Sequence, residues 1–150
     1  MRVVVQRVKQ ASVVVSGETI AVINKGLLIL LGITAEDTSE DIDWLVKKIT
    51  QLRIFDDEEG VMNVSGLDAG AEYLVVSQFT LHASTKKGNR PSYIRAARPE
   101  VAQPLYEAFV ENLRSLVETS VGTGRFGAHM EVGLINDGPV TIIIDTQNKE

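Results

Sequence analysis

Residues 27–33 are Leu-Leu-Ile-Leu-Leu-Gly-Ile, and they include the longest apolar run of the chain. A strand that is apolar on both faces is buried on both faces, so we expect these residues at the centre of a sheet. Valine-rich segments at 1–8 and 11–15 precede it, followed by a turn at Ser16-Gly17 and a returning strand at 18–23. This pattern predicts antiparallel strands joined by short turns.

Two amphipathic helices are expected after these strands. Thr38 can cap the first helix, since Asp41 follows three residues later and apolar residues then recur at helical spacing to Leu52. Pro99 begins the second, whose apolar face includes Tyr106, Phe109 and Leu113. Further strands are expected at 72–79, 129–135 and 140–144. The sequence therefore predicts one domain over 1–150, of class α+β, with a mostly antiparallel, barrel-like sheet and two main helices.

Composition excludes several kinds of chemistry. The chain has 150 residues and no cysteine, which excludes disulfides, thiolate metal sites and cysteine nucleophiles. With only two histidines, a histidine-rich metal centre is not expected, and we predict no metal and no cofactor. No apolar segment approaches the ~20 residues that span a membrane, and the N-terminal residues lack a signal-peptide pattern. We therefore expect no membrane association and a cytoplasmic protein.

The charge distribution reverses locally. The net charge is −5, which by itself does not favour a nucleic-acid partner. Segment 83–98, however, contains five basic residues and no acidic one. Two interpretations stay open from charge alone: a solvated loop, or a surface that contacts phosphate groups.

Hydroxyl side chains at the end of the 72–79 strand are the candidate nucleophiles. Ser77 or Thr80 would each need a histidine and an acid to act as a triad nucleophile. His82 is near in sequence, but strand neighbours alternate between faces and Ser77 and His82 are an odd number of residues apart. We therefore expect His82 to be a loop histidine and not a catalytic base.

Two short signatures resemble those of the D-aminoacyl-tRNA deacylase family. The first is Ser-Gln-x-x-Leu at 77–81, and the second is Asn-x-Gly-Pro-x-Thr at 136–141. The resemblance covers essentially the whole chain, including the opening residues 1–8 and the Phe-Gly-Ala-His-Met stretch at 126–130.

The resemblance implies a homodimer that hydrolyses the ester between a D-amino acid, or glycine, and the 3′ adenosine end of tRNA, including glycine mischarged on tRNA(Ala). It implies a catalytic pocket at the subunit interface, with no metal, formed by Ser77, Gln78, Phe79 and Thr80. The Gly138-Pro139 bond would be cis, would be held by Arg7 and would enter the partner's pocket, where it excludes L-amino acids. Phe126 and Met130 would lie near the adenosine, and the basic segment would contact tRNA through Lys86, Lys87 and Arg90.

The role of Thr80 has two readings. It is either a nucleophile or a group that positions water with help from the substrate 2′-hydroxyl, and we favour positioning because nothing in the sequence lowers the pKa of its hydroxyl. An activated ester needs less assistance than an amide, and backbone amides near Phe79 and Thr80 would stabilise an oxyanion.

Two other functions remain open from the sequence. One is a small-molecule esterase or amidase that uses Ser77 or Thr80. The other is a non-enzymatic RNA-binding dimer, although Tyr93 is the only aromatic residue in the basic segment.

Overall fold

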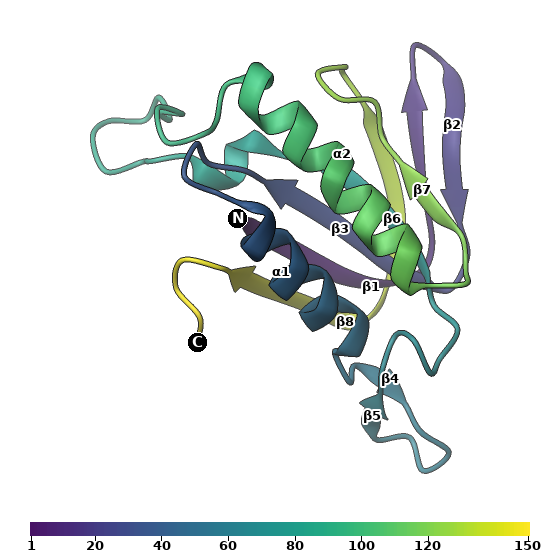
Figure 1. The fold of residues 1–150 in the computed structure, drawn as a ribbon. Helices are drawn as coiled ribbons and strands as arrows, with labels where there is room; N and C mark the ends of the chain where they lie inside the picture. Colours follow the sequence, from purple (N-terminus) through teal and green to yellow (C-terminus); the bar gives the residue numbers. More distant parts are fainter.

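The computed structural model describes all residues from Met1 to Glu150. Its main sheet has the order β2-β1-β3-β6-β7, and β8 also pairs with β1. The elements are β1 (Arg2–Val15), β2 (Glu18–Ile23), β3 (Gly26–Gly32), α1 (Ser39–Gln51), β4 (Phe55–Asp56), β5 (Met62–Val64), β6 (Glu72–Ser77), η1 (Phe79–His82), α2 (Pro99–Leu116), β7 (Val121–Thr123) and β8 (Glu131–Asp145). Both helices cover one side of the sheet (Figure 1).

The sheet is mixed, which refines the predicted mostly antiparallel arrangement. Strand β1 pairs antiparallel with β2, β3 and β8, as the short turns predicted. Strands β3, β6 and β7 are instead parallel to one another. The connections from β3 to β6 and from β6 to β7 contain α1 and α2, and a helical crossover places the following strand parallel. The α+β class with two main helices and a barrel-like sheet is confirmed.

The two ends of the sheet approach each other, so that the barrel is nearly closed. A Cβ on Gly122 of β7 would lie 3.3 Å from the Cβ of Ala21 in β2. The central strand β3 is almost entirely buried, as its apolar run predicted. One core cluster lies between the sheet and the helices and includes Tyr73, Phe109 and Leu45. A second lies inside the barrel and includes Val13, Leu28 and Leu74.

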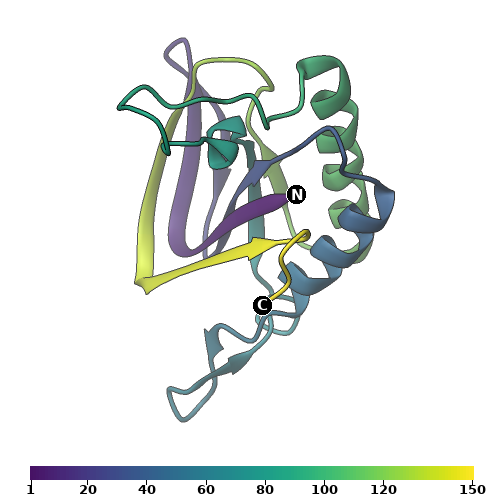
Figure 2. The same cartoon turned by 90° about the vertical axis from the view of Figure 1, so that its left-hand side faces the viewer.

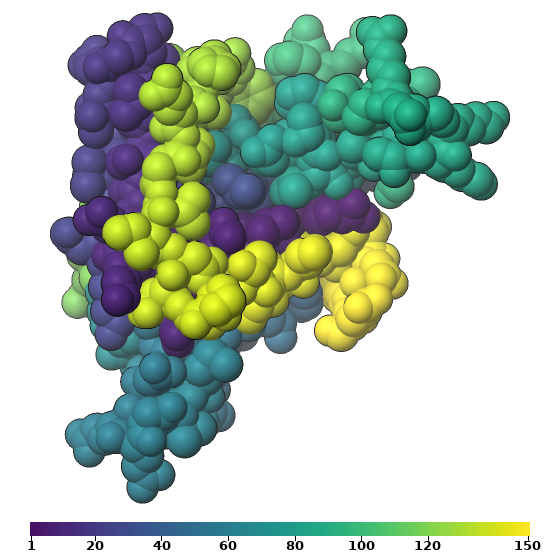
Figure 3. All heavy atoms as spheres, turned by 180° about the vertical axis from the view of Figure 1, so that it is seen from behind, coloured from purple at the N-terminus to yellow at the C-terminus, as the bar shows by residue number.

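Strand β8 is one continuous strand and not the two predicted ones. Both halves pair with β1, which is itself continuous over the two segments predicted at 1–8 and 11–15. Residues 136–139 form a corner within β8 and not a hairpin turn, because the chain returns to the same partner strand after them. Figure 2 shows this bend, and Figure 3 shows β8 lying across β1 on the face away from the helices.

Both helices begin as predicted. The Thr38 N–H donates to Asp41 Oδ2 at 2.9 Å, which satisfies a free amide at the start of α1. Helix α2 begins at Pro99 and contains Pro104 within its first turns. Neither helix is long and apolar enough to cross a membrane.

Candidate active site

The first signature lies at the end of β6, where the chain turns into the short helix η1. The Gln78 N–H donates to the Leu31 carbonyl at 2.8 Å, so this turn continues the pairing of β6 with β3. The first bond of η1 runs from the Leu81 N–H to the Gln78 carbonyl, and the N–H groups of Phe79 and Thr80 have no backbone acceptor. Phe79 is 56% exposed, although its side chain is large and apolar. The turn therefore offers two free amides and an exposed aromatic ring at the surface.

The geometry around Thr80 contains no activating base. Gln78 Nε2 donates to Thr80 Oγ1, so the Thr80 hydroxyl is left free to donate its own proton. His82 is buried in η1, with 2% of its surface exposed, and neither ring nitrogen has a hydrogen-bond partner. His82 was predicted in a loop, but it lies in η1, and its ring turns inward and packs beside Gly32. Burial lowers the pKa of His82, which keeps the imidazole neutral.

The second signature forms the corner of β8. Val8 pairs with Asn136 and Gln6 with Thr141, so the four residues 137–140 lie opposite Arg7 alone. The Asn136 side chain closes the base of this loop, since the Val140 N–H donates to Asn136 Oδ1 at 2.8 Å and Asn136 Nδ2 donates to the Val140 carbonyl at 3.2 Å. Gln6 Nε2 also donates to Thr141 Oγ1 at 3.2 Å. Asn136 and Thr141 thus brace the corner, a role that the sequence signature did not indicate.

Arg7 holds the corner through hydrogen bonds to backbone carbonyls. Its Nε donates to the Asp137 carbonyl at 2.8 Å, and its Nη1 donates to the Ile54 carbonyl at 2.7 Å. Asp56 Oδ1 lies 3.3 Å from the same Nη1. The Gly138-Pro139 peptide bond is cis, and both residues are exposed at the tip of the corner.

A single chain keeps the two signatures apart. Ser77 is level with Val3 of β1, because Leu31 pairs with both of these residues. The corner is level with Arg7, about 13 Å away along the strand at ~3.3 Å per residue. Strands β1 and β3 also lie between β8 and β6. One site containing both signatures therefore requires a second copy of the chain.

Phe126 and Met130 lie on opposite faces of the sheet near the end of β6. The Phe126 ring packs against Tyr106 on the helix side, with 5.8 Å between ring centroids. Met130 packs on the barrel side, and its sulfur fills the space that a Cβ on Gly124 would occupy. The Gly124 N–H bonds the Val75 carbonyl, two residues before Ser77. The structure thus brings both residues to the same end of β6 as the first signature, but not to one another.

The basic segment projects from this end of the sheet (Figures 1 and 3). Ser84 and Ser92 bond each other reciprocally and close the base of a loop that carries Lys86, Lys87 and Arg90. All three side chains are exposed, and no carboxylate pairs with them. The Tyr93 ring meets Phe79 edge to face at 5.1 Å, which ties the segment to the first signature. Sequence periodicity could not predict this contact, because it joins two irregular segments.

Comparison with known proteins decides the family. The family model described as D-Tyr-tRNA(Tyr) deacylase matches residues 4–145. The chain belongs to this deacylase family. A curated D-aminoacyl-tRNA deacylase from Bacteroides thetaiotaomicron is 63% identical over the full length of both chains. One from Chromobacterium violaceum is 59% identical, also over the full length of both chains.

Solved structures agree with the deacylase fold. The structure titled c-Myc DNA Unwinding Element Binding Protein has a TM-score of 0.93 and 44% identity, and the match covers 97% of this chain and 99% of that one. A probable eukaryotic D-amino acid tRNA deacylase has a TM-score of 0.82 at 18% identity, with 95% and 97% of the two chains covered, which shows a shared fold. The structure contains no group of three or more His, Asp or Glu side chains that could hold a metal ion.

Proposed function

We propose that the protein hydrolyses the ester of D-aminoacyl-tRNA, releasing free D-amino acid and tRNA, and that it rejects L-aminoacyl-tRNA. Membership of the deacylase family makes it a hydrolase of aminoacyl-tRNA esters. The single observation that carries the finer proposal is the Gly138-Pro139 corner, which is exposed, braced by Asn136 and anchored by Arg7.

The corner supplies a means of chiral selection. D- and L-aminoacyl esters present the same groups, so attraction alone discriminates poorly between them, and a clash with the wrong isomer is more selective. A backbone wall suits this task because it cannot rotate away as a side chain can. Gly138 has no Cβ and allows close approach of a ligand, while the bond from Arg7 to the Asp137 carbonyl holds the wall in place. An L side chain would meet this wall, whereas a D side chain would point away from it.

Glycine would pass the same filter, because it has no side chain to exclude. We therefore include glycyl-tRNA(Ala) among the substrates. This part of the proposal is tested separately from chirality, by offering glycyl-tRNA(Ala) and L-alanyl-tRNA(Ala) to the protein in parallel. Hydrolysis of the first alone supports exclusion by side-chain shape, and sparing of both contradicts it.

The chemistry of the site follows from the turn at 77–80. Water adds to the ester carbonyl, the oxyanion forms, and its collapse breaks the bond to the ribose oxygen, which takes a proton as the tRNA leaves. The free N–H groups of Phe79 and Thr80 would donate to the oxyanion. Thr80 accepts from Gln78 and keeps its own proton to donate, so it positions water or the substrate and does not attack, and the substrate 2′-hydroxyl assists.

The active form in this proposal is a homodimer. Each Gly138-Pro139 corner would enter the partner's pocket beside Ser77 and Thr80, because one chain keeps the two apart. The basic loop would hold tRNA phosphates next to the same pocket, and Phe126 and Met130 would lie near the adenosine. Deacylation of D- and L-tyrosyl-tRNA, with and without exhaustive EDTA treatment, tests the proposal. It predicts hydrolysis of the D ester alone, with no dependence on added metal.

The esterase alternative is tested by the same preparation. A small-molecule esterase would hydrolyse free D-tyrosine esters at full rate without tRNA. We expect slow hydrolysis of such esters, because they lack the adenosine and the phosphates that the basic loop would contact.

A further inference from the structure

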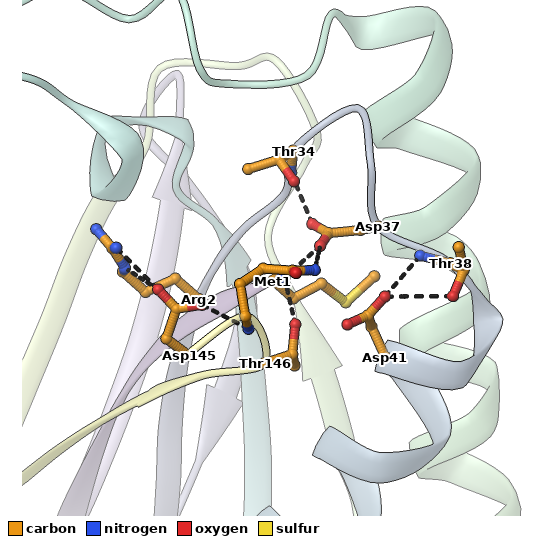
Figure 4. A network of polar contacts seen from close by, with 9 residues as sticks. Met1, Arg2, Thr34, Asp37, Thr38, Asp41, Asp145 and Thr146 are labelled. Atoms are coloured by element: carbon orange, nitrogen blue, oxygen red, sulfur yellow. Dashed lines mark hydrogen bonds and ion pairs between the residues drawn. The ribbon is translucent and has the colours of Figure 1, made fainter. Parts of the chain in front are cut away.

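The helix η1 is held from behind by a residue outside both signatures. Arg2, the first residue of β1, donates from Nη1 to the Leu81 carbonyl at 2.8 Å. Its Nε and Nη2 both donate to Asp145 Oδ2, at 2.9 and 2.8 Å. One guanidinium therefore joins the turn that carries Thr80 to the last residue of β8. Figure 4 shows Arg2 beside Asp145, with η1 next to the guanidinium.

The Leu81 carbonyl depends on Arg2 for this bond. In a continuing helix it would accept from the N–H of Ser84, but that N–H donates to the Ser92 carbonyl at 2.8 Å. Arg2 therefore supplies the hydrogen bond at the point where η1 stops and the basic loop begins. A hydrogen bond from a charged donor is stronger than one between neutral groups, so a single contact here restricts the turn.

Asp145 fixes the direction of the guanidinium. The side chains of Arg2 and Asp145 are 30% and 16% exposed, so the pair is partly shielded from water. Burial alone raises the pKa of Asp145. Hydrogen bonds from the Gln147 amide and from Arg2 together lower it by more, so the net pKa lies below its usual range. The carboxylate therefore stays ionised and accepts two of the Arg2 donors.

The frame behind Arg2 is built from both ends of the chain. The Met1 ammonium donates to Asp37 and, at 2.7 Å, to Thr146 Oγ1 (Figure 4). Asp37 also accepts from the Thr34 N–H at 2.7 Å. These contacts fix the start of β1 and the end of β8 to the loop that follows β3. On its other side, η1 packs against Gly32, where a Cβ would lie 3.0 Å from the Leu81 Cβ.

We propose that Arg2 is a positioning residue for deacylation, which holds η1 so that Thr80 and the free amides of residues 79 and 80 face the ester. Arg2 acts through the Leu81 carbonyl and touches no substrate. Asp145 supports it by orienting the guanidinium. This inference rests on the proposed function, because it assigns a task to the turn that would bind the ester.

The test compares Arg2→Met, Arg2→Lys and Asp145→Asn with wild type, using D-tyrosyl-tRNA and L-tyrosyl-tRNA. Arg53→Met is the matched control, since Arg53 also donates to a backbone carbonyl, that of Asn63 at 2.9 Å, but in the β4–β5 hairpin. For Arg2→Met we expect kcat to fall about tenfold to a hundredfold, the range that corresponds to loss of one charge-assisted hydrogen bond. KM should change less than twofold, and rejection of the L ester should be unchanged, because the Gly138 corner is untouched.

The variants distinguish positioning from a general structural role. Arg2→Lys keeps one charged donor and should recover part of kcat, and Asp145→Asn should reduce kcat less than Arg2→Met does. Arg53→Met should keep the wild-type kcat. Wild-type kcat in Arg2→Met, or a loss of kcat shared equally with Arg53→Met, would overturn the inference while leaving the deacylase function intact. An inactive wild-type protein would overturn both.

Discussion

Replacing Arg7 by methionine is expected to destabilise the fold and weaken chiral selection together. Arg7 is 7% exposed and donates to the carbonyls of Asp137 and Ile54 at 2.8 and 2.7 Å. Methionine fills a similar volume but donates no hydrogen bond, so both carbonyls lose their partner. Each bond from a charged donor contributes ~1.5–3 kcal/mol, so losing both lowers the free energy of unfolding by ~3–6 kcal/mol.

The functional consequence follows from the position of the lost contacts. Without Arg7 the 137–140 corner is held only at its base, by the side-chain bonds of Asn136 and Thr141. A wall that moves no longer excludes the L side chain, and each tenfold of selectivity corresponds to ~1.4 kcal/mol. We expect the ratio of D to L hydrolysis to fall ten- to a hundredfold in Arg7→Met. The D to L ratio should fall less in Arg7→Lys, because lysine keeps the positive charge. It should still fall, since lysine cannot donate in both directions as the guanidinium does.

Two measurements check this prediction. Urea unfolding gives the change in stability, and deacylation of D- and L-tyrosyl-tRNA below the unfolding transition gives the selectivity. Arg114→Met is the control, since Arg114 is exposed and its side chain bonds Glu111 on the surface of α2 at 2.9 Å. Unchanged stability together with unchanged rejection of the L ester in Arg7→Met would refute the reasoning.

Three further predictions concern charge, the site hydroxyl and pH. Replacing Lys86, Lys87 and Arg90 together by neutral residues should raise KM for tRNA and reduce its salt dependence, because fewer counterions are released on binding. An unchanged salt dependence would show that the loop does not contact tRNA. Thr80→Ser should keep most of the activity and Thr80→Val should lose most of it, measured as single-turnover hydrolysis, and equal rates for both would remove the hydroxyl from the mechanism. Burial lowers the pKa of His82 in the fold, so the unfolded chain binds more protons and stability should fall as pH drops below ~6.5. Between pH 7.5 and 5.5 the urea midpoint should fall less in His82→Gln than in wild type. An equal fall in the two proteins would contradict the prediction.

The sequence predicted the parts of the fold that local patterns determine. The uninterrupted apolar run at 27–31 gave the central strand, and the Thr38–Asp41 pair gave the start of α1. The parallel pairing of β3 with β6 could not be obtained this way, because register between distant strands depends on how α1 and α2 pack. The corner of β8 was predicted as a hairpin turn, because turn residues do not show that both flanking strands pair with the same partner strand.

The candidate site was predictable only from its signatures. Nothing in the periodicity around Ser77 or Gly138 indicates catalysis, and only their resemblance to a family joined the two segments. The inward position of His82 was missed because a turn residue can point either way, and packing against Gly32 decides it. The contact of Arg2 with a backbone carbonyl could not be predicted from residue type, and the role of Arg7 at the corner came only from the family resemblance.

Hydrolysis of D- and L-tyrosyl-tRNA by the purified protein tests the central claim most directly. The two substrates differ only in the configuration of the amino-acid Cα, so they share the ester, the adenosine and every tRNA phosphate. We predict rapid release of D-tyrosine, with L-tyrosyl-tRNA hydrolysed no faster than in buffer alone. Equal enzymatic hydrolysis of the two esters would contradict selection by the Gly138-Pro139 corner, and hydrolysis of neither would contradict the deacylase function itself.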